Sequence, residues 1–168
     1  MTTPGQTVGP FFGYSLPYAG GPDLVPRAHP AAVRLHGRVL DGAGAPVPDA
    51  LLEIWQTAPD GTVVREPGSL LRDGYTFTGW GRCATDNAGA YSFTTLVPGG
   101  GFFAMTVFAR GLLDRLFTRV YLPGTRSAFL ESLPEDRRRT LVASASPGGF
   151  AFDVVLQGAG ETVFLALT

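Results

Sequence analysis

Apolar and polar side chains alternate along several short stretches of the chain, and this alternation predicts β-strands with one buried face. The first stretch runs over residues 33–40 (V-R-L-H-G-R-V-L), and the D-G-A-G segment at 41–44 has the composition of a tight turn. The further stretches of this kind are residues 50–56, 83–86, 90–93, 101–110, 116–122, 150–156 and 161–167. Such short strands separated by turn residues predict a mainly β protein, an antiparallel β-sandwich of seven or eight strands.

One segment, residues 127–145, departs from the strand pattern and predicts one or two short helices. Ser132 is placed to cap a helix that has Pro134 at its start and two acidic residues in its first turn. The three arginines at 137–139 then lie toward the C-terminal end, which suits the helix dipole. We interpret this segment as a solvated helix over one end of the sandwich.

The first 32 residues form an irregular N-terminal arm. Prolines recur between positions 4 and 30 and prevent a regular element, whereas Phe11, Phe12, Tyr14 and Tyr18 need burial. We expect the arm to lie over its own domain or over a partner. The expected organisation is a single domain, 1–168, with the arm at 1–32 and a β-sandwich core at 33–168.

Composition narrows the possible partners. The chain has 168 residues, a formal net charge of −1 and 13 cationic side chains, all of them arginine. This balance argues against partners held by bulk charge, such as nucleic acid or an anionic membrane. A single cysteine, Cys83, cannot form an internal disulfide, and the first residues lack the pattern of a signal peptide. We expect a soluble, cytoplasmic protein.

The residues taken alone contain no recognisable catalytic constellation. His29 and His36 are the only histidines, and neither has a second ligand-type residue at metal spacing. We interpret His36 as a structural residue of its strand and Cys83 as a packed thiol. We interpret the aspartates in or beside turns as turn caps: Asp60, Asp73, Asp86, Asp114 and Asp153.

Three features remain without a structural explanation. They are the ordered motif G-x-V-x-D-x-x-G-x-P-V-x-x-A at 37–50, the compact T-V-G-P-F-F at 7–12, and Arg110. Arg110 ends the most apolar predicted strand. An arginine there either extends into solvent or pairs with an anion.

Together these segments resemble the intradiol ring-cleavage dioxygenases. The matching segments follow one another over nearly the whole chain, at residues 3–12, 36–56, 81–99, 108–122 and 152–164. The first reads T-P-G-Q-T-V-G-P-F-F and the fourth F-A-R-G-L-L-D-R-L-F-T-R-V-Y-L. The resemblance implies a β-sandwich core and a role in aromatic catabolism.

The resemblance also implies a ferric ion, which the catalytic chain of the family binds through two tyrosines and two histidines. The corresponding positions here hold Val63, Gly101, Phe102 and Ala104, so all four ligands are missing. A family glutamine near the iron corresponds to Arg119. The resemblance is therefore to an alpha-type chain, with no metal ligand and no catalytic residue of its own.

In this family each active site lies between an alpha chain and a beta chain, and the beta chain holds Fe(3+). The residues carried over as substrate-binding positions of the alpha chain are Thr7, Gly9, Pro10 and Arg110. The implied assembly is an alpha–beta hetero-oligomer. It would cleave protocatechuate, a small aromatic acid, with O2 to 3-carboxy-cis,cis-muconate. Arg110 would contact either the substrate carboxylate or an acid at the interface, and sequence leaves both open.

Two other functions compete with this one. A free-standing, transthyretin-like β-sandwich binding module is an alternative, because the motif at 37–50 is only a fold signal. Such a module has no need of the T-V-G-P segment or of Arg110. A complete dioxygenase acting alone is the third hypothesis, and the missing ligands argue against it.

Overall fold

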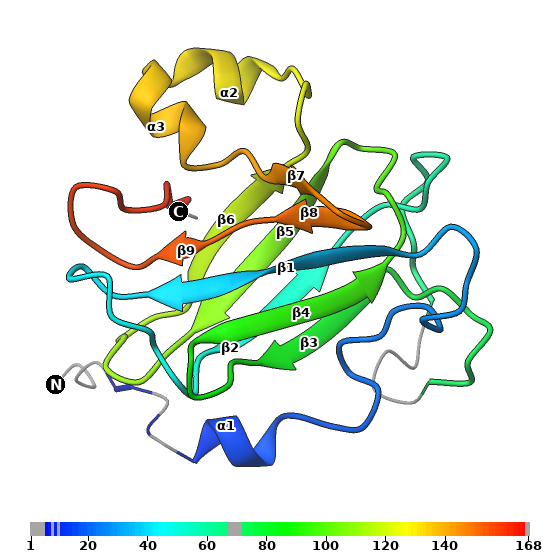
Figure 1. Cartoon of the computed structure of the whole chain (residues 1–168), viewed down its shortest axis with the longest axis horizontal. Helices are drawn as coiled ribbons and strands as arrows, with labels where there is room; N and C mark the ends of the chain where they lie inside the picture. Colours follow the sequence, from blue (N-terminus) through cyan, green and yellow to red (C-terminus); the bar gives the residue numbers. More distant parts are fainter. Residues whose placement is uncertain (1–5, 8, 10, 67–71, 167–168) are drawn as a thin grey trace, which may run out of the picture.

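Residues 6–7, 9, 11–66 and 72–166 are described by a computed structural model of the chain (Figure 1). Among them are nine strands and three short helices. The strands are β1 Val33–Leu40, β2 Leu51–Trp55, β3 Trp80–Ala84, β4 Ala90–Thr95, β5 Phe102–Phe108, β6 Leu116–Tyr121, β7 Ser144–Ser146, β8 Gly149–Ala151 and β9 Val154–Val155. The helices are α1 Phe12–Ser15, α2 Ala128–Ser132 and α3 Glu135–Arg139.

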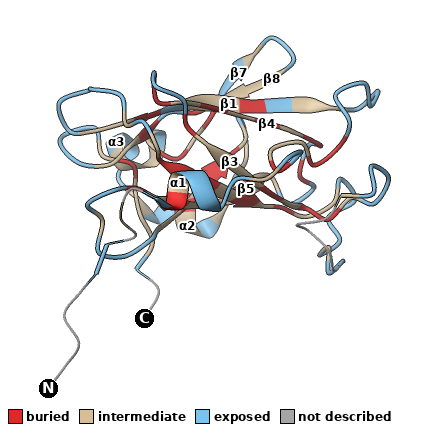
Figure 2. Cartoon of the chain, turned by 90° about the horizontal axis from the view of Figure 1, so that it is seen from below, coloured by how far each residue is buried: buried red, intermediate tan, exposed pale blue. Residues whose placement is uncertain are grey.

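The strands form two sheets that pack face to face. One sheet has the order β4-β1-β8-β7, with β9 also paired to β1, and the other has the order β3-β2-β5-β6. Most pairings are antiparallel, whereas β8 and β9 pair with β1 in parallel. Figure 2 shows buried positions on the strands of both layers, with exposed residues gathered in the loops. The predicted β-sandwich is confirmed.

The helical segment is shorter than predicted, and its caps differ. The Ser127 hydroxyl, not that of Ser132, accepts a hydrogen bond from a helical N–H, that of Leu130 at 3.1 Å. Ser132 instead donates to the carbonyl of Phe129 at 2.7 Å. Leu133 is extended, as expected of a residue before proline, and separates α2 from α3. Beyond α3 the chain forms strand β7, where a helix had been predicted.

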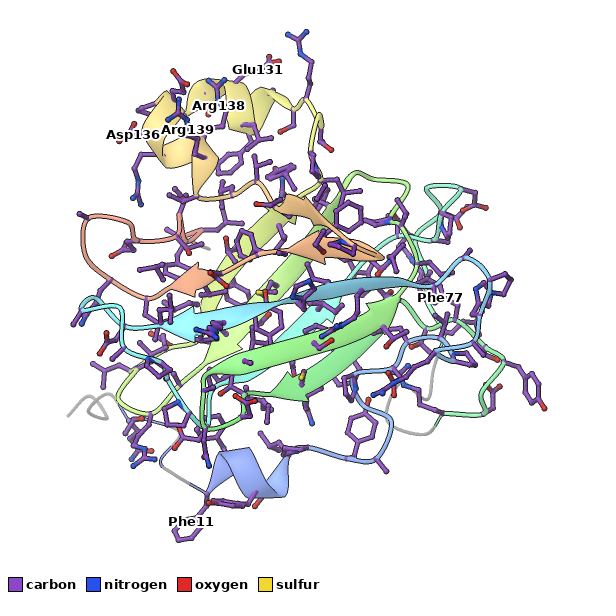
Figure 3. All side chains as sticks on the ribbon, viewed as in Figure 1. Phe11, Phe77, Glu131, Asp136, Arg138 and Arg139 are labelled. Carbon is purple, nitrogen blue, oxygen red and sulfur yellow. The ribbon has the colours of Figure 1, made fainter. Side chains whose placement is uncertain are left out.

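All three arginines of α3 make contacts within the chain, and Arg137 and Arg138 are only partly exposed, so the helix is less solvated than predicted. Arg138 donates to the carbonyls of Leu130 and Leu133 at 2.8 and 3.1 Å and so caps the end of α2. Arg139 pairs with Glu135 one turn earlier. Figure 3 shows Arg138 and Arg139 beside the helix pair.

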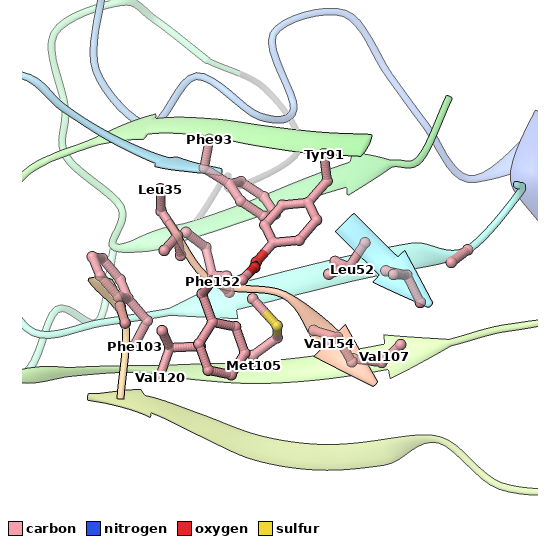
Figure 4. Packing of buried hydrophobic residues seen from close by; sticks show 14 of the residues in the cluster. Leu35, Leu52, Tyr91, Phe93, Phe103, Met105, Val107, Val120, Phe152 and Val154 are labelled. Atoms are coloured by element: carbon pink, nitrogen blue, oxygen red, sulfur yellow. The ribbon is translucent and has the colours of Figure 1, made fainter. Parts of the chain in front are cut away.

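The main core lies between the two sheets (Figure 4). Inward-facing positions of β1 alternate with outward ones: Leu35 and Val39 are fully buried, and Arg34 and Arg38 are exposed. The same alternation places Phe103, Met105 and Val107 of β5 in this core. This periodicity of two is why the strands could be located from the sequence.

The predicted strand at 150–156 is interrupted, because the chain crosses closely over β1 at Gly37. A Cβ on Gly37 would lie 1.8 Å from the carbonyl oxygen of Phe152. At this crossing Asp153 accepts the N–H of Arg38 through its carboxylate at 2.8 Å. A side chain therefore replaces one rung of the ladder, and β8 and β9 become separate strands.

The predicted strand at 161–167 is wrong over its described part, 161–166, which contains no strand. Its backbone makes single hydrogen bonds to several different segments: the N–H groups of Thr162 and Leu165 donate to the carbonyls of Val155 and Phe117 at 2.9 and 2.7 Å, and Val163 bonds to threonine hydroxyls. The Val163 carbonyl accepts from the Thr118 hydroxyl at 2.8 Å, and the Val163 N–H donates to the Thr140 hydroxyl at 3.1 Å. Alternating apolar residues here pack on β6 and the helix pair without forming a ladder.

The arm also differs from the prediction, because it contains the four-residue helix α1 despite its prolines. No helix in the described residues has the length and apolarity to cross a membrane.

Candidate functional site

The arm meets the residues around Arg110 at one corner of the molecule. The Thr7 hydroxyl accepts a hydrogen bond from the N–H of Gly111 at 3.1 Å. Gly9, two residues on, has a φ of 70°, a conformation that glycine adopts without strain. We call Thr7, Gly9, Asp49, Arg110 and Gly111 the arm corner. Pro10, the remaining predicted site residue, lies outside the described residues.

Arg110 pairs with a carboxylate of its own chain. Its Nε donates to Oδ2 of Asp49 at 3.1 Å, and its Nη2 bonds to the same oxygen. The side chain of Arg110 is 61% exposed and that of Asp49 only 19%. Asp49 thus orients the guanidinium while more than half of the arginine side chain faces solvent. Sequence analysis left two possibilities for Arg110, extension into solvent or pairing with an anion, and the structure shows an ion pair with Asp49.

Aromatic and aliphatic side chains are exposed near the arm corner. Phe11, directly before α1, is 77% exposed, and Tyr14, within α1, is 84% exposed. Leu113, three residues after Arg110, is 67% exposed. Figure 3 shows Phe11 directed away from the fold. Large apolar side chains exposed in this way are candidates for a protein interface.

The arm beyond α1 covers its own sheet, at the edge strand β3. Arg82 donates to Glu53 from Nε at 2.9 Å and from Nη2 at 2.6 Å, and its Nη1 donates to the Leu16 carbonyl at 2.9 Å. The Tyr18 ring stacks on Trp80, with centroids 6.3 Å apart. The sequence left open whether the arm lies over its own domain or over a partner. The part that includes Leu16 and Tyr18 lies over its own domain.

Arg72 makes a second anchor for the arm. Its guanidinium donates to the carbonyls of Gly20, Gly21 and Trp80 and to the hydroxyl of Thr78, at 2.7 to 3.2 Å. Sequence analysis missed the anchoring roles of Arg72 and Arg82. Most of their acceptors are backbone carbonyls of residues distant in sequence. Because every residue has a carbonyl, the pattern of residue types does not indicate these bonds.

The four positions predicted to correspond to iron ligands lie near one end of the four-stranded sheet. Gly101 is in the turn before β5, and Phe102 and Ala104 are on the outer face of that strand. Val63 is 55% exposed in the loop between β2 and β3. None of these side chains has a nitrogen, oxygen or sulfur atom, so they do not fit a ferric ion. Over the described ranges, no group of three or more His, Cys, Asp or Glu side chains could hold a metal.

Arg119 places a cation beside these positions. It pairs across the ladder with Ala104, and its guanidinium carbon lies 4.8 Å from the ring centroid of Phe102 and 5.8 Å from that of Phe129. Its Nη1 donates to the Tyr121 hydroxyl at 3.2 Å. The aromatic faces stabilise the guanidinium, whose charge opposes a second cation nearby. Sequence analysis identified the substitution at 119 but not its stacking on α2.

His36 and Cys83 have structural surroundings. The His36 ring contacts the Ser146 hydroxyl at 3.1 Å, between β1 and β7. Burial raises the pKa of the Cys83 thiol above its ordinary value, which suppresses the reactive thiolate. Asp60, Asp73 and Asp86 each accept backbone N–H groups of their own turns, as predicted. Asp153, also predicted as a turn cap, instead accepts the N–H of Arg38 on β1.

Comparison with known proteins places these features in one family. The family model described as Dioxygenase (Dioxygenase_C) matches residues 8–124. The chain is 37% identical to the protocatechuate 3,4-dioxygenase alpha chain of Burkholderia cepacia, over 96% of this chain and 95% of that protein. It is 30% identical to the beta chain of the same enzyme in that organism, over 75% of this chain and 64% of that one.

A solved dioxygenase domain has a similar fold. The dioxygenase domain of a dioxygenase–carbohydrate-binding protein fusion from Streptomyces sp. SirexAA-E superposes with a TM-score of 0.60 at 25% identity. That match covers 94% of this chain and 99% of the solved domain.

Proposed function

The chain belongs to the intradiol ring-cleavage dioxygenases, and from this premise we propose that it is the iron-free alpha subunit of a protocatechuate 3,4-dioxygenase. The observation that carries the proposal is the replacement of all four ligand positions by side chains without donor atoms, with the Arg119 cation beside them. Similarity to both alpha and beta chains supports an alpha–beta assembly. Coverage that includes the arm favours a subunit over a free-standing binding module.

The proposed partner is a beta chain that holds Fe(3+), the metal this family uses. The bound iron supplies the chemistry of ring cleavage, in which both atoms of O2 enter the product, 3-carboxy-cis,cis-muconate. This chain would contribute the arm corner to the wall of that site. The exposed Phe11, Tyr14 and Leu113 would be covered by the beta chain.

Each residue of the arm corner would have a definite task. Thr7 holds the arm against Gly111, so Gly9 presents backbone without a side chain where a flat ring needs close approach. Asp49 orients Arg110, which would bind the carboxylate of protocatechuate through its exposed nitrogens or pair with an acid of the beta chain. Pro10 would fix the course of the arm.

The first test is the iron content and colour of this chain purified alone and again together with a beta chain. We expect a colourless, iron-free chain, and a coloured complex that consumes O2 with protocatechuate. Iron and tyrosinate-to-iron colour in this chain alone would overturn the proposal.

The second test concerns Arg110 in the assembled enzyme. Arg110→Gln should raise the KM for protocatechuate about tenfold or more, because a guanidinium–carboxylate contact would be lost. Arg126→Gln is the matched control, since Arg126 is an exposed arginine paired with Glu131 far from the arm corner. An unchanged KM and kcat in the Arg110 variant would exclude a substrate role for this residue.

A further inference from the structure

A cavity of about 520 Å³ opens on the outer face of the five-stranded sheet. Arg34 of β1 and Ser92 and Thr94 of β4 form its floor. Its walls come from the turn at Pro147–Gly148, between β7 and β8, and from the segment that leads into β1. Nothing in the motifs or in the proposed subunit role accounts for this cavity.

The backbone fixes the shape of the cavity. A Cβ on Gly149 would lie 2.0 Å from the Arg34 carbonyl oxygen, so only glycine lets the β7–β8 hairpin approach β1 this closely. The Arg34 N–H donates to the Gly148 carbonyl at 2.9 Å and joins the wall to the floor. The floor side chains face outward because their neighbours Leu35 and Phe93 are fully buried.

The charged groups that line the cavity are both cations. Arg34 donates from Nε to the Ser92 hydroxyl at 2.9 Å, which fixes the plane of the guanidinium. Within the described ranges no carboxylate forms an ion pair with Arg34, and its two Nη groups have no acceptor. Arg27, the second cation, makes only a 3.4 Å contact with Asp23 and is 81% exposed. Asp and Glu are absent from the described lining.

We propose that this cavity binds a small organic carboxylate. The Arg34 Nη groups, held in plane by Ser92, match the two oxygens of one carboxylate, and Arg27 adds a second positive charge. Ala32, Val33 and Pro147 line the rest of the cavity and would contact an apolar body carrying the acid group. The volume accommodates a ligand of one ring or a short acyl chain.

The test is calorimetric titration of the full chain with benzoate, which combines a carboxylate with an apolar ring. We expect saturable binding with a dissociation constant on the order of 1 mM or tighter. Benzamide, the neutral isostere, and inorganic phosphate, an anion without an apolar body, should each bind at least about tenfold more weakly. Equal binding of either compound would overturn the corresponding half of the proposal.

Two variants locate the site. Arg34→Gln should weaken the binding of benzoate about tenfold or more. Arg38 is an exposed arginine on the same face of β1, and Arg38→Gln should leave benzoate binding unchanged. Equal weakening in both variants would mean a general charge effect, and no saturable binding to the unaltered chain would exclude the site. Shifts of the Ser92 and Gly148 amide resonances on titration give a second readout that needs no variant.

Discussion

The outer faces of the two sheets, which point away from the shared core, carry different side chains. The four-stranded sheet presents aromatic residues, among them Trp55, Trp80 and Phe102. The five-stranded sheet presents Arg34 and Arg38, with serine and threonine on the neighbouring strand. Segments from outside the sheet cover much of the aromatic face, whereas the polar face is open enough to hold a cavity.

This difference shows how each face is stabilised. The aromatic face is held by side chains: Tyr121, Leu130 and Leu141 form a second buried cluster beneath the helix pair, and Arg82 ties the arm over Trp80. In the five-stranded sheet the close contacts are between backbone atoms, at Gly37 and Gly149. We therefore expect replacement of these glycines to destabilise the five-stranded sheet. Replacement of the anchoring side chains should loosen the segments that cover the aromatic face.

The largest effect is expected from Gly37→Ala. The new Cβ would meet the Phe152 carbonyl, which also accepts the Tyr91 hydroxyl at 2.6 Å, so the backbone has to move. We expect a loss of about 3 kcal/mol or more in the free energy of unfolding, measured by denaturant titration. Gly160→Ala is the control, since nothing lies within 4 Å of its added Cβ, and it should change stability by less than about 0.5 kcal/mol. Equal stability of the two variants would contradict the close packing at Gly37.

A smaller loss is expected from Arg82→Gln on the aromatic face. The pair with Glu53 is mostly buried, with side-chain exposures of 16% and 20%, so the substitution leaves a carboxylate without its cation. We expect a loss of about 2 kcal/mol and faster proteolysis of the arm near Leu16, whose carbonyl Arg82 holds.

The control for Arg82 is Arg126→Gln, because its ion pair with Glu131 has exposures of 87% and 51%. A surface pair of this kind contributes about 0.5 kcal/mol or less. If both variants lose the same stability, or if the arm is cleaved no faster in the Arg82 variant, Arg82 is not the anchor of the arm.

The strands of the core could be predicted because burial on one face imposes alternation in the sequence. Residues 33–40 were located at both ends, since Leu35 and Val39 enter the core while Arg34 and Arg38 do not. Residues 161–166 alternate as well, yet they form no strand, because their backbone bonds are divided among carbonyls of β9 and β6 and the hydroxyl groups of Thr118 and Thr140. The alternation indicates which side chains are buried, but it does not indicate the hydrogen-bond partners of the backbone.

The candidate site was predictable where a residue type carries the chemistry. Val63, Gly101, Phe102 and Ala104 could be named as replaced ligand positions because the resemblance gives a place for each donor, and this correspondence stays a prediction. The partner of Arg110 was not found, because Asp49 lies in a turn at a φ of 61° and comes close only in the fold. Acidic residues in turns are so often caps that the pairing gave no signal.

The smallest predicted effect is the pH dependence due to Cys83, on the covered edge strand β3. Burial raises the pKa of its thiol in the folded chain. As the pH rises above about 8.5, the unfolded chain loses this proton first, so stability should fall until the folded pKa is passed. The free energy of unfolding should decrease less between pH 7 and 9.5 in Cys83→Ala than in the unaltered chain.

The accessibility of the Cys83 thiol is measured by its alkylation rate. Alkylation of the folded chain should be about tenfold slower than that of the unfolded chain, and Arg34→Gln on the open face should not change this rate. Alkylation at the unfolded rate would mean that the arm and the edge strand leave this thiol accessible.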